Sequence, residues 1–238
     1  MSSTNTMIDV VIPVYNEEED LEKSIGRLAS YLDAHCPYHW RIIIADNASR
    51  DRTPEIGRRL AEAMPRVDYL RLEQKGRGRA LKQAWTQSQA DVMSYMDVDL
   101  STDLSAFIPL IEPLVNGRYE VAIGSRLARG AQTTRGLKRE VISRIYNLMI
   151  KIAFPRRRFS DAQCGFKAIT QTAARDLLPL VKDTGFFFDS ELLLKAEAHG
   201  YRIHEVPVRW VDDPGTRVKI GKTAWEDIKG LWRVRLGG

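Results

Sequence analysis

Apolar and polar residues follow one another along the first half of the chain in blocks of two different periods. Short runs rich in β-favouring residues predict buried strands at 9–15, 40–46, 68–72, 91–96 and 121–126. The segments between them space their apolar residues three or four apart, which predicts helices. Strands that alternate with helices form a mostly parallel sheet with right-handed crossovers. We therefore expect an α/β fold, a doubly wound, mostly parallel sheet with helices on both faces.

The carboxyl ends of these predicted strands carry residues suited to ligand binding. Ligands of doubly wound sheets bind in the crevice outside the carboxyl ends of the strands. The residues at or just after those ends are Asn16, Asp46, Gly76, Asp97, Asp99 and Arg126. Their clustering predicts a binding site at this edge of the sheet.

Asp97 and Asp99 follow the fourth predicted strand with one residue between them. Hard divalent cations such as Mg²⁺ are held by one or two carboxylates and shared with substrate phosphates, so this pair suits a metal diphosphate. A solvated acidic turn would have the same sequence. The other residues at the sheet edge favour the metal site.

The second half of the chain contains a basic segment, residues 135–159, with eight basic residues against one acidic residue. Its net charge of +7 exceeds the +5 of the whole chain, so the positive charge is local. Its apolar residues predict a basic amphipathic helix over about 139–155. The apolar stripe consists of Val141, Ile145, Leu148, Met149 and Ile152. Such a helix packs this stripe against the core or lies on anionic lipid, where each Lys or Arg adds about 1 kcal/mol.

The remaining elements do not suggest a second domain. A short helix is expected after the motif at 161–168, a strand at 202–208, and a last basic helix that contains Trp225 and Trp232. No repeat, low-complexity tract or flexible linker is visible, so we expect residues 1–238 to form a single domain.

Composition narrows the setting of the protein. The 238 residues are 44% hydrophobic, enough for a core, and the pI near 9.2 favours anionic partners such as nucleic acid, nucleotide phosphates or lipid. Cys36 and Cys164 lie far apart, which fits a reducing cytosol and no zinc or disulfide framework. No signal peptide or apolar run of ~20 residues is visible. We expect a soluble or peripheral protein.

Three other nucleotide-binding classes are disfavoured. The Gly76–Gly78 pair follows the third strand rather than the first, and Leu81 stands where a dinucleotide fingerprint requires glycine. No Gly-x-x-x-x-Gly-Lys-Ser/Thr loop is present. A sugar-phosphate nucleotidyltransferase would have a glycine-rich loop after its first strand, whereas this chain has Pro13 to Glu18 there.

Six motifs, in order, resemble those of family 2 inverting glycosyltransferases, and within that family the dolichyl- or polyprenyl-phosphate sugar synthases. The likeness runs from about residue 8 to residue 219. The motifs are Val11–Glu18, Asp46–Thr53, Lys75–Gly78, Asp97–Asp99, Gly124–Arg126 and Asp161–Lys167.

The resemblance implies a GT-A fold, with a nucleotide-sugar-binding half at about 8–126 and an acceptor-binding half at about 127–238. It implies that Asp97 faces the donor's ribose or the metal, that Asp99 is the more direct ligand of Mg²⁺ or Mn²⁺, and that Arg77 lies beside the nucleotide where the family usually has Lys. Ser101 stands where relatives often have Gln, so water would complete the metal's ligands. The residues expected to hold the base and ribose are Pro13, Tyr15, Glu17 and Asp46.

For the acceptor, the resemblance implies a polyprenyl phosphate gripped by Arg126 and Arg139, with Arg135 a weaker candidate. Asp161 would be a base or would orient the acceptor, with Glu191 as the second candidate for that role. The segment 213–219 would form a lid over the diphosphate, with Arg217 and Lys219 as its cations.

The function implied is inverting transfer of one hexose from a UDP- or GDP-hexose to polyprenyl phosphate, by a peripheral protein at the cytoplasmic face of the cell membrane. Anionic membrane lipid, and an integral-membrane protein, would be further partners. Val206 precedes Arg209 and Trp210 where processive synthases have Gln, which favours transfer of a single sugar. Two alternatives remain, a soluble glycan or protein acceptor and a basic nucleic-acid-binding module. No nucleic-acid motif supports the latter.

Overall fold

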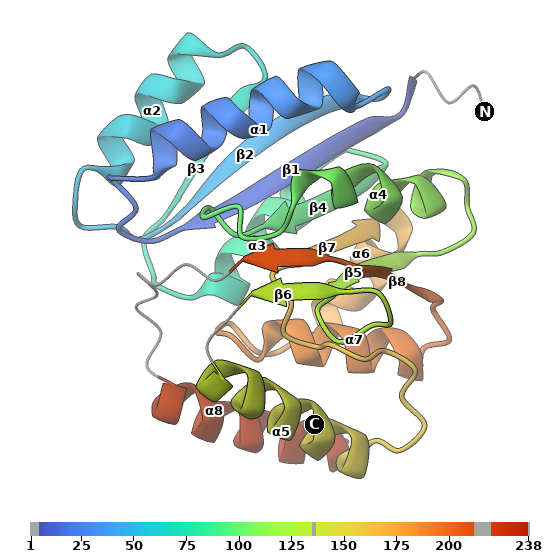
Figure 1. Cartoon of the computed structure of the whole chain (residues 1–238). Coiled ribbons are helices and arrows are strands. Elements are labelled where there is room, and N and C mark those ends of the chain that lie inside the picture. The colour runs from blue at the N-terminus through green and yellow to red at the C-terminus, as the bar shows by residue number, and fades with distance from the viewer. Residues whose placement is uncertain (1–4, 135–136, 212–219, 238) are drawn as a thin grey trace.

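The computed structural model describes residues 5–134, 137–211 and 220–237. Seven of the described strands form one sheet in the order β3-β2-β1-β4-β7-β5-β8, with helices on both of its faces (Figure 1). Every neighbouring pair is parallel except the pairs made by β7, which is antiparallel to β4 and to β5. The expectation of a mostly parallel sheet covered by helices is confirmed.

The chain alternates strands and helices as far as β5. The strands are β1 (Met7–Val14), β2 (His39–Asn47), β3 (Val67–Leu72), β4 (Val92–Met96), β5 (Val121–Ser125), β6 (Gln132–Thr134), β7 (Phe166–Thr170), β8 (Ile203–Pro207) and β9 (Arg209–Val211). The helices are α1 (Leu21–His35), α2 (Thr53–Ala63), α3 (Arg77–Gln87), α4 (Phe107–Val115), α5 (Leu137–Ala153), α6 (Gln171–Leu177), α7 (Phe188–Ala198) and α8 (Ile220–Arg235). Short 3₁₀ helices are η2 (Leu104–Ala106) and η3 (Leu178–Leu180).

The central strands are apolar throughout because both faces of the sheet are covered. In β1, Val10 and Ile12 pack with α1, α2 and α4, whereas Val11 packs on the other face with α3, α6 and α7. Successive side chains of a strand point to opposite faces. A strand buried on both sides therefore needs consecutive rather than alternating apolar residues.

The motif at 161–168 contains a strand that the sequence pattern did not predict. β7 begins at Phe166 and lies between β4 and β5, with Met96 opposite Phe166 and Val121 opposite Ile169. Lys167 interrupts its apolar pattern, yet this side chain is fully buried and its ammonium group lies 3.4 Å from Asp189. The strand was not predicted because a charged residue interrupts its apolar sequence.

One local expectation needs correction, and one small sheet was not predicted. Arg77, expected in a loop before a helix at 80, lies in the first turn of α3. β6 and β9 form a small parallel sheet that was not predicted, in which Thr133 pairs with Trp210. Among the residues that the structure describes, no helix is both long and apolar enough to cross a membrane. The division into a donor half and an acceptor half stays a prediction.

Candidate active site

The loops after three parallel strands, at the edge predicted to bind ligand, contain residues with left-handed backbone conformations. Asn16 after β1, Ala48 after β2 and Leu100 after β4 have φ angles of 55°, 61° and 48°. Such conformations cost a non-glycine residue about 1–3 kcal/mol and persist only where the surroundings fix them. The turns that begin the site are therefore specifically shaped.

The loops after β1 and β2 are hydrogen-bonded to each other. The Asn16 backbone N–H donates to the Ser49 hydroxyl at 3.0 Å, and its side-chain oxygen accepts from the Arg50 N–H at 2.8 Å. The Glu17 N–H donates to the Thr53 hydroxyl at 2.8 Å. These bonds join two of the predicted donor-binding motifs, which are far apart in sequence, into one surface.

Pro13 and Tyr15, the other predicted base-binding residues of the first motif, are both half-buried at the end of β1. The ammonium group of Lys75 lies 3.3 Å from the centre of the Tyr15 ring, a cation–π contact. The motif at Lys75–Gly78 therefore meets the motif around Tyr15.

Asp46 is fully buried at the end of β2. Its carboxylate accepts hydrogen bonds from the Ser49 backbone N–H, the Tyr69 hydroxyl and an Arg71 guanidinium N–H at 2.9, 2.5 and 2.8 Å. Burial, followed by the bond to Asp46, raises the pKa of Tyr69 to about 12. Because Asp46 is fully buried, a nucleobase can bond to it only if one of the surrounding side chains moves. The sequence analysis did not identify Tyr69 and Arg71.

Asp97 and Asp99 lie in the loop after β4, with Asp97 44% exposed and Asp99 on the surface. The Asp97 backbone N–H donates to the Gly165 carbonyl, and a Cβ on Gly165 would lie 1.8 Å from an Asp97 carboxylate oxygen. Asp99 accepts a hydrogen bond from the Ser101 N–H at 2.9 Å. Only glycine at 165 leaves the Asp97 side chain in this position.

These two carboxylates fit a hard divalent cation that keeps several waters. The described residues contain no cluster of three or more His, Cys, Asp or Glu side chains that could hold a metal. Mg²⁺ needs no such cluster, because it binds through one or two carboxylates together with water and substrate phosphates. Asp97 and Asp99 could hold a metal of this kind in the presence of a diphosphate.

Arg77 joins Asp97 to a residue that the sequence analysis did not identify. Its guanidinium lies 2.6 Å from Asp97 and 2.7 Å from Asp189 of α7. Burial alone would lower the pKa of Arg77, but Asp97, Tyr95 and Asp189 together raise it well above its usual value. The cation predicted to lie beside the nucleotide is thus held directly against the predicted metal site.

Asp189 is the centre of a buried ionic network. The Tyr95 hydroxyl donates to it, and the Lys167 ammonium lies 3.4 Å away. Burial raises the pKa of Asp189, but Lys167 and Arg77 outweigh that effect and the pKa is lowered. Two cations, Arg77 and Lys167, thus offset the buried charge of Asp189, and Arg77 also binds the more exposed Asp97.

Arg126 and Asp161 form a second buried ion pair. Two guanidinium nitrogens of Arg126 lie 2.7 and 3.0 Å from the two oxygens of Asp161, a bidentate geometry. Burial raises the pKa of Asp161, but the Arg126 charge and hydrogen bonds prevail and lower it to about 2. An ionised carboxylate with both oxygens bonded is a weak base. The geometry favours a role in orienting Arg126, whose guanidinium carbon lies 5.4 Å from the Trp210 ring.

Glu191, the second candidate for the base, is buried away from these pairs. It accepts hydrogen bonds from the backbone N–H groups of Lys182 and Asp183 and from Arg233 of α8. None of these partners belongs to the predicted site, so the structure favours a structural role for Glu191.

Four predicted acceptor or lid residues are not covered by the description. Arg135, Arg217 and Lys219 lie outside the described residues, and Arg139 lies in α5 with its side chain outside the description. Their roles stay predictions.

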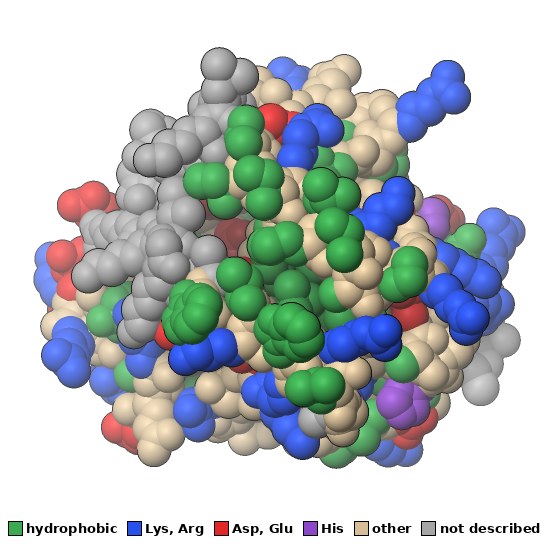
Figure 2. Space-filling view, turned by 90° about the horizontal axis from the view of Figure 1, so that it is seen from below, with side chains coloured by type: hydrophobic (Ala, Val, Ile, Leu, Met, Phe, Trp, Pro, Cys, Tyr) green, Lys and Arg blue, Asp and Glu red, His purple; other side chains and the backbone are tan. Residues whose placement is uncertain are grey.

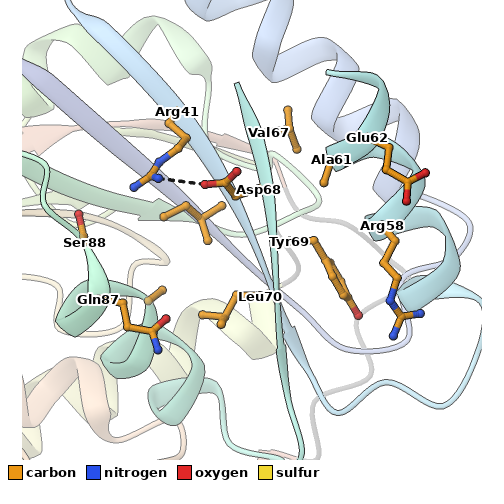
Figure 3. Close-up of a pocket in the computed structure, with 12 residues that line it drawn as sticks. Arg41, Arg58, Ala61, Glu62, Val67, Asp68, Tyr69, Leu70, Gln87 and Ser88 are labelled. Carbon is orange, nitrogen blue, oxygen red and sulfur yellow. Dashed lines mark hydrogen bonds and ion pairs between the residues drawn. The ribbon is translucent and has the colours of Figure 1, made fainter. Parts of the chain in front are cut away.

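A cavity of about 550 Å³ lies beside the edge strand β3, between α2 and α3 (Figure 3). It is lined by the first four residues of β3 and not by the carboxyl end of that strand. Arg41 and Asp68 form an ion pair on one side of it, and Arg58 lies over the Tyr69 ring on the other. None of the predicted site residues lines it. The candidate active site is instead the open edge of the sheet.

Solved structures share this fold. Glucosyl-3-phosphoglycerate synthase from Mycobacterium tuberculosis, in complex with Mn²⁺, UDP-glucose and phosphoglyceric acid, superposes with a TM-score of 0.72 at 20% identity over 98% of this chain and 80% of its own. This likeness and the sheet order show a GT-A-type fold. Residues 9–178 match the family model described as Glycosyl transferase family 2, and the chain belongs to that family.

Curated relatives cover almost the whole chain. Glycosyltransferase AglD of Haloferax volcanii is 35% identical over 94% of this chain, which spans only 35% of that relative. A dolichyl-phosphate beta-glucosyltransferase of Trichomonas vaginalis is 27% identical over 94% of this chain and 73% of its own length. Dolichol-phosphate mannosyltransferase of Pyrococcus furiosus is 29% identical over 95% and 63%. The family resemblance expected from the motifs is confirmed.

Proposed function

We propose that this glycosyltransferase moves one hexose, with inversion, from a UDP- or GDP-hexose to a polyprenyl phosphate. The observation that carries the proposal is that the carboxylate pair Asp97 and Asp99 and the buried Arg126 lie around one sheet edge, joined by segment 161–165. Relatives named for transfer to dolichyl phosphate support the choice of acceptor.

On the donor side, Asp97 and Asp99 would hold Mg²⁺ or Mn²⁺ on the diphosphate, and Arg77 would add a fixed positive charge beside it. The bound ion would neutralise the negative charge that grows on the nucleoside diphosphate as the sugar leaves. The base and ribose would contact the joined loops after β1 and β2. The residues concerned are Pro13, Tyr15, Glu17 and Asp46.

On the acceptor side, a phosphate oxygen of the lipid attacks the anomeric carbon while the bond from that carbon to the diphosphate oxygen breaks on the opposite face. A phosphate monoester is already ionised at neutral pH, so this nucleophile needs no base. It does need cations. Arg126, which Asp161 orients, would be one of them. The others would be Arg139, Arg135 and the predicted lid residues Arg217 and Lys219.

The direct test is an incubation of the enzyme with polyprenyl phosphate, Mg²⁺ or Mn²⁺, and a panel of UDP- and GDP-hexoses. We expect a glycolipid with one donor, and loss of at least about a hundredfold in rate for Asp99→Ala, since metal and charge stabilisation are worth several kcal/mol. Calorimetry with UDP and with GDP identifies the nucleobase of the donor. No turnover with any donor contradicts the proposal.

We also place the enzyme at the cytoplasmic face of the cell membrane, as a peripheral protein with an integral-membrane partner. A lipid acceptor requires the site to lie close to a bilayer. Fractionation of cells should recover the chain with the membranes, and release of part of it by salt would support a peripheral association.

A further inference from the structure

Helix α5 has its apolar stripe on the outside. Val141, Ile145, Leu148 and Ile152 are between 52% and 73% exposed. The opposite stripe, which packs on the core, includes the polar residues Ser143 and Asn147 together with Tyr146 and Ile150. The interpretation that the apolar stripe faces the core is therefore wrong for these four exposed residues.

Helix α8 shows the same reversal. Trp225 and Trp232 on one face of the helix, and Leu236 directly after it, are between 59% and 79% exposed. Asp227 and Leu231 lie on the inner face and are almost fully buried. A surface helix of a soluble protein normally has the opposite arrangement.

The two helices pack against each other, so their outer stripes share one face of the molecule, on which apolar side chains gather at the centre with Lys and Arg around them (Figure 2). We call this surface the docking plate. It consists of Val141, Ile145, Leu148, Ile152, Trp225, Trp232 and Leu236. Isolated exposed apolar residues are normal, but a contiguous group of seven large ones marks an interaction surface.

Basic side chains surround the docking plate. Lys151, Arg156, Lys229 and Arg235 are exposed on α5, just after it, or on α8. The Lys229 ammonium lies 5.3 Å from the centre of the Trp225 ring, so positive charge and an aromatic ring are adjacent. Tryptophan favours the boundary between lipid and water, and Lys and Arg bind anionic headgroups.

We propose that the docking plate binds the surface of an anionic lipid bilayer, with α5 and α8 lying in the plane of the interface. A second copy of the chain is a poorer occupant, because a symmetric contact through this face would bring the two basic rims together. The inference rests on the proposed function in one respect, that the lipid acceptor would lie in the same bilayer.

The inner faces of both helices are hydrogen-bonded to the segment that orients Arg126. The Ala162 backbone N–H donates to the Asn147 side-chain oxygen of α5 at 3.1 Å. The Gln163 amide donates to Asp227 of α8 at 3.0 Å. Asp161, the partner of Arg126, directly precedes these two residues. The polar inner stripes thus fix the docking plate relative to the predicted acceptor cation.

The test is flotation of the full chain with vesicles that contain no polyprenyl phosphate. We expect co-flotation with vesicles of phosphatidylcholine and phosphatidylglycerol, and weaker flotation in high salt or with phosphatidylcholine alone. The variant Leu148→Ser/Trp232→Ser should bind more than about tenfold more weakly, because two exposed apolar anchors are removed. Leu180→Ser, at a residue 36% exposed but outside the docking plate, should bind like the wild type.

Circular dichroism and thermal unfolding check that both variants are folded. The inference is overturned if the folded wild type does not float with either vesicle, or if the double variant floats equally well. It is also overturned if the double variant instead abolishes a dimer seen by light scattering, because the plate would then bind a second copy. Turnover of a short, water-soluble prenyl phosphate separates the two proposals, since it persists if only the docking inference fails.

Discussion

At the scale of single residues, the predicted site falls into two buried ion pairs and one exposed pair of acids. The sequence analysis identified Asp97 and Arg126 from their places at predicted strand ends, and Arg77 and Asp161 from the family motifs in which they stand. It did not identify Asp189, which binds Arg77. Asp189 follows three phenylalanines and lies two residues before Glu191, and carboxylates in so apolar a segment were the available signal, since buried charges are paired.

The close contact at Gly165 gives a first prediction for single residues. In Gly165→Ala the new methyl group would collide with the Asp97 carboxylate, so Asp97 must rotate away. We expect Mn²⁺-dependent binding of the nucleotide to weaken by at least about tenfold, the loss of roughly one charge-assisted contact. Calorimetry measures it. Gly26→Ala in α1, where nothing lies within 4 Å of the new Cβ, should leave binding unchanged.

The two ion pairs of Arg77, with Asp97 and with Asp189, give a second prediction for single residues. Removal of this cation in Arg77→Ala leaves the buried Asp189 with the Lys167 ammonium and the Tyr95 hydroxyl. Breaking a buried pair in this way costs about 3 kcal/mol or more in the free energy of unfolding, measured by urea titration. Arg52→Ala breaks the pair with Glu55, in which both side chains are mostly exposed, and should leave the free energy of unfolding almost unchanged. Equal losses in the two variants would show that the bridge is not stabilising.

At the scale of secondary structure, the sequence predicted the strands β1 to β5 and β8 and missed β6, β7 and β9. β1, β2 and β4 are buried on both faces and were recognised as apolar runs. β7 contains Lys167, and β6 and β9 have only three residues each, so neither pattern nor length marked them as strands. The sequence could not predict which side of α5 faces the core. An apolar stripe on a helix becomes a buried face only when other elements pack against it, and the sequence does not say whether they do.

The inward-facing acid of α8 gives a prediction for an element. Burial, followed by the nearby Asp183, Glu226 and Asp189, raises the pKa of Asp227 to about 7. Because the folded state favours the neutral acid, protonated Asp227 stabilises the folded protein. This contribution to the free energy of unfolding is complete below about pH 4 and is lost as the pH rises through 7. In Asp227→Asn the amide oxygen still accepts from Gln163.

We therefore expect the free energy of unfolding of the wild type, relative to Asp227→Asn, to fall by about 2–4 kcal/mol between about pH 4 and about pH 8. Urea titrations of both proteins across this range measure it. A constant difference between the two curves would rule out titration of Asp227 as the cause.

At the scale of the whole molecule, stability should be greatest in the middle of the sheet and least on the side of the docking plate. β1, β4 and β7 are flanked by strands and covered by helices, whereas α5 and α8 bury one face each. Hydrogen exchange should be slowest in those strands, and faster in α8. Anionic vesicles should slow exchange in α5 and α8 but not in α2 on the opposite side of the sheet. Unchanged exchange in the presence of vesicles to which the protein is bound would place the contact elsewhere.

The reversed direction of β7 has a consequence for how two substrates can meet. β4 leaves the sheet at the point where β7 enters it, so Met96 lies opposite Phe166 and the chain just before β7 abuts the chain just after β4. Had β7 run the other way, its first residue would lie about 13 Å away, at the far end of a five-residue strand. A single antiparallel strand thus brings the early and late parts of the polypeptide to a common boundary, and the proposed transfer of a sugar would take place there.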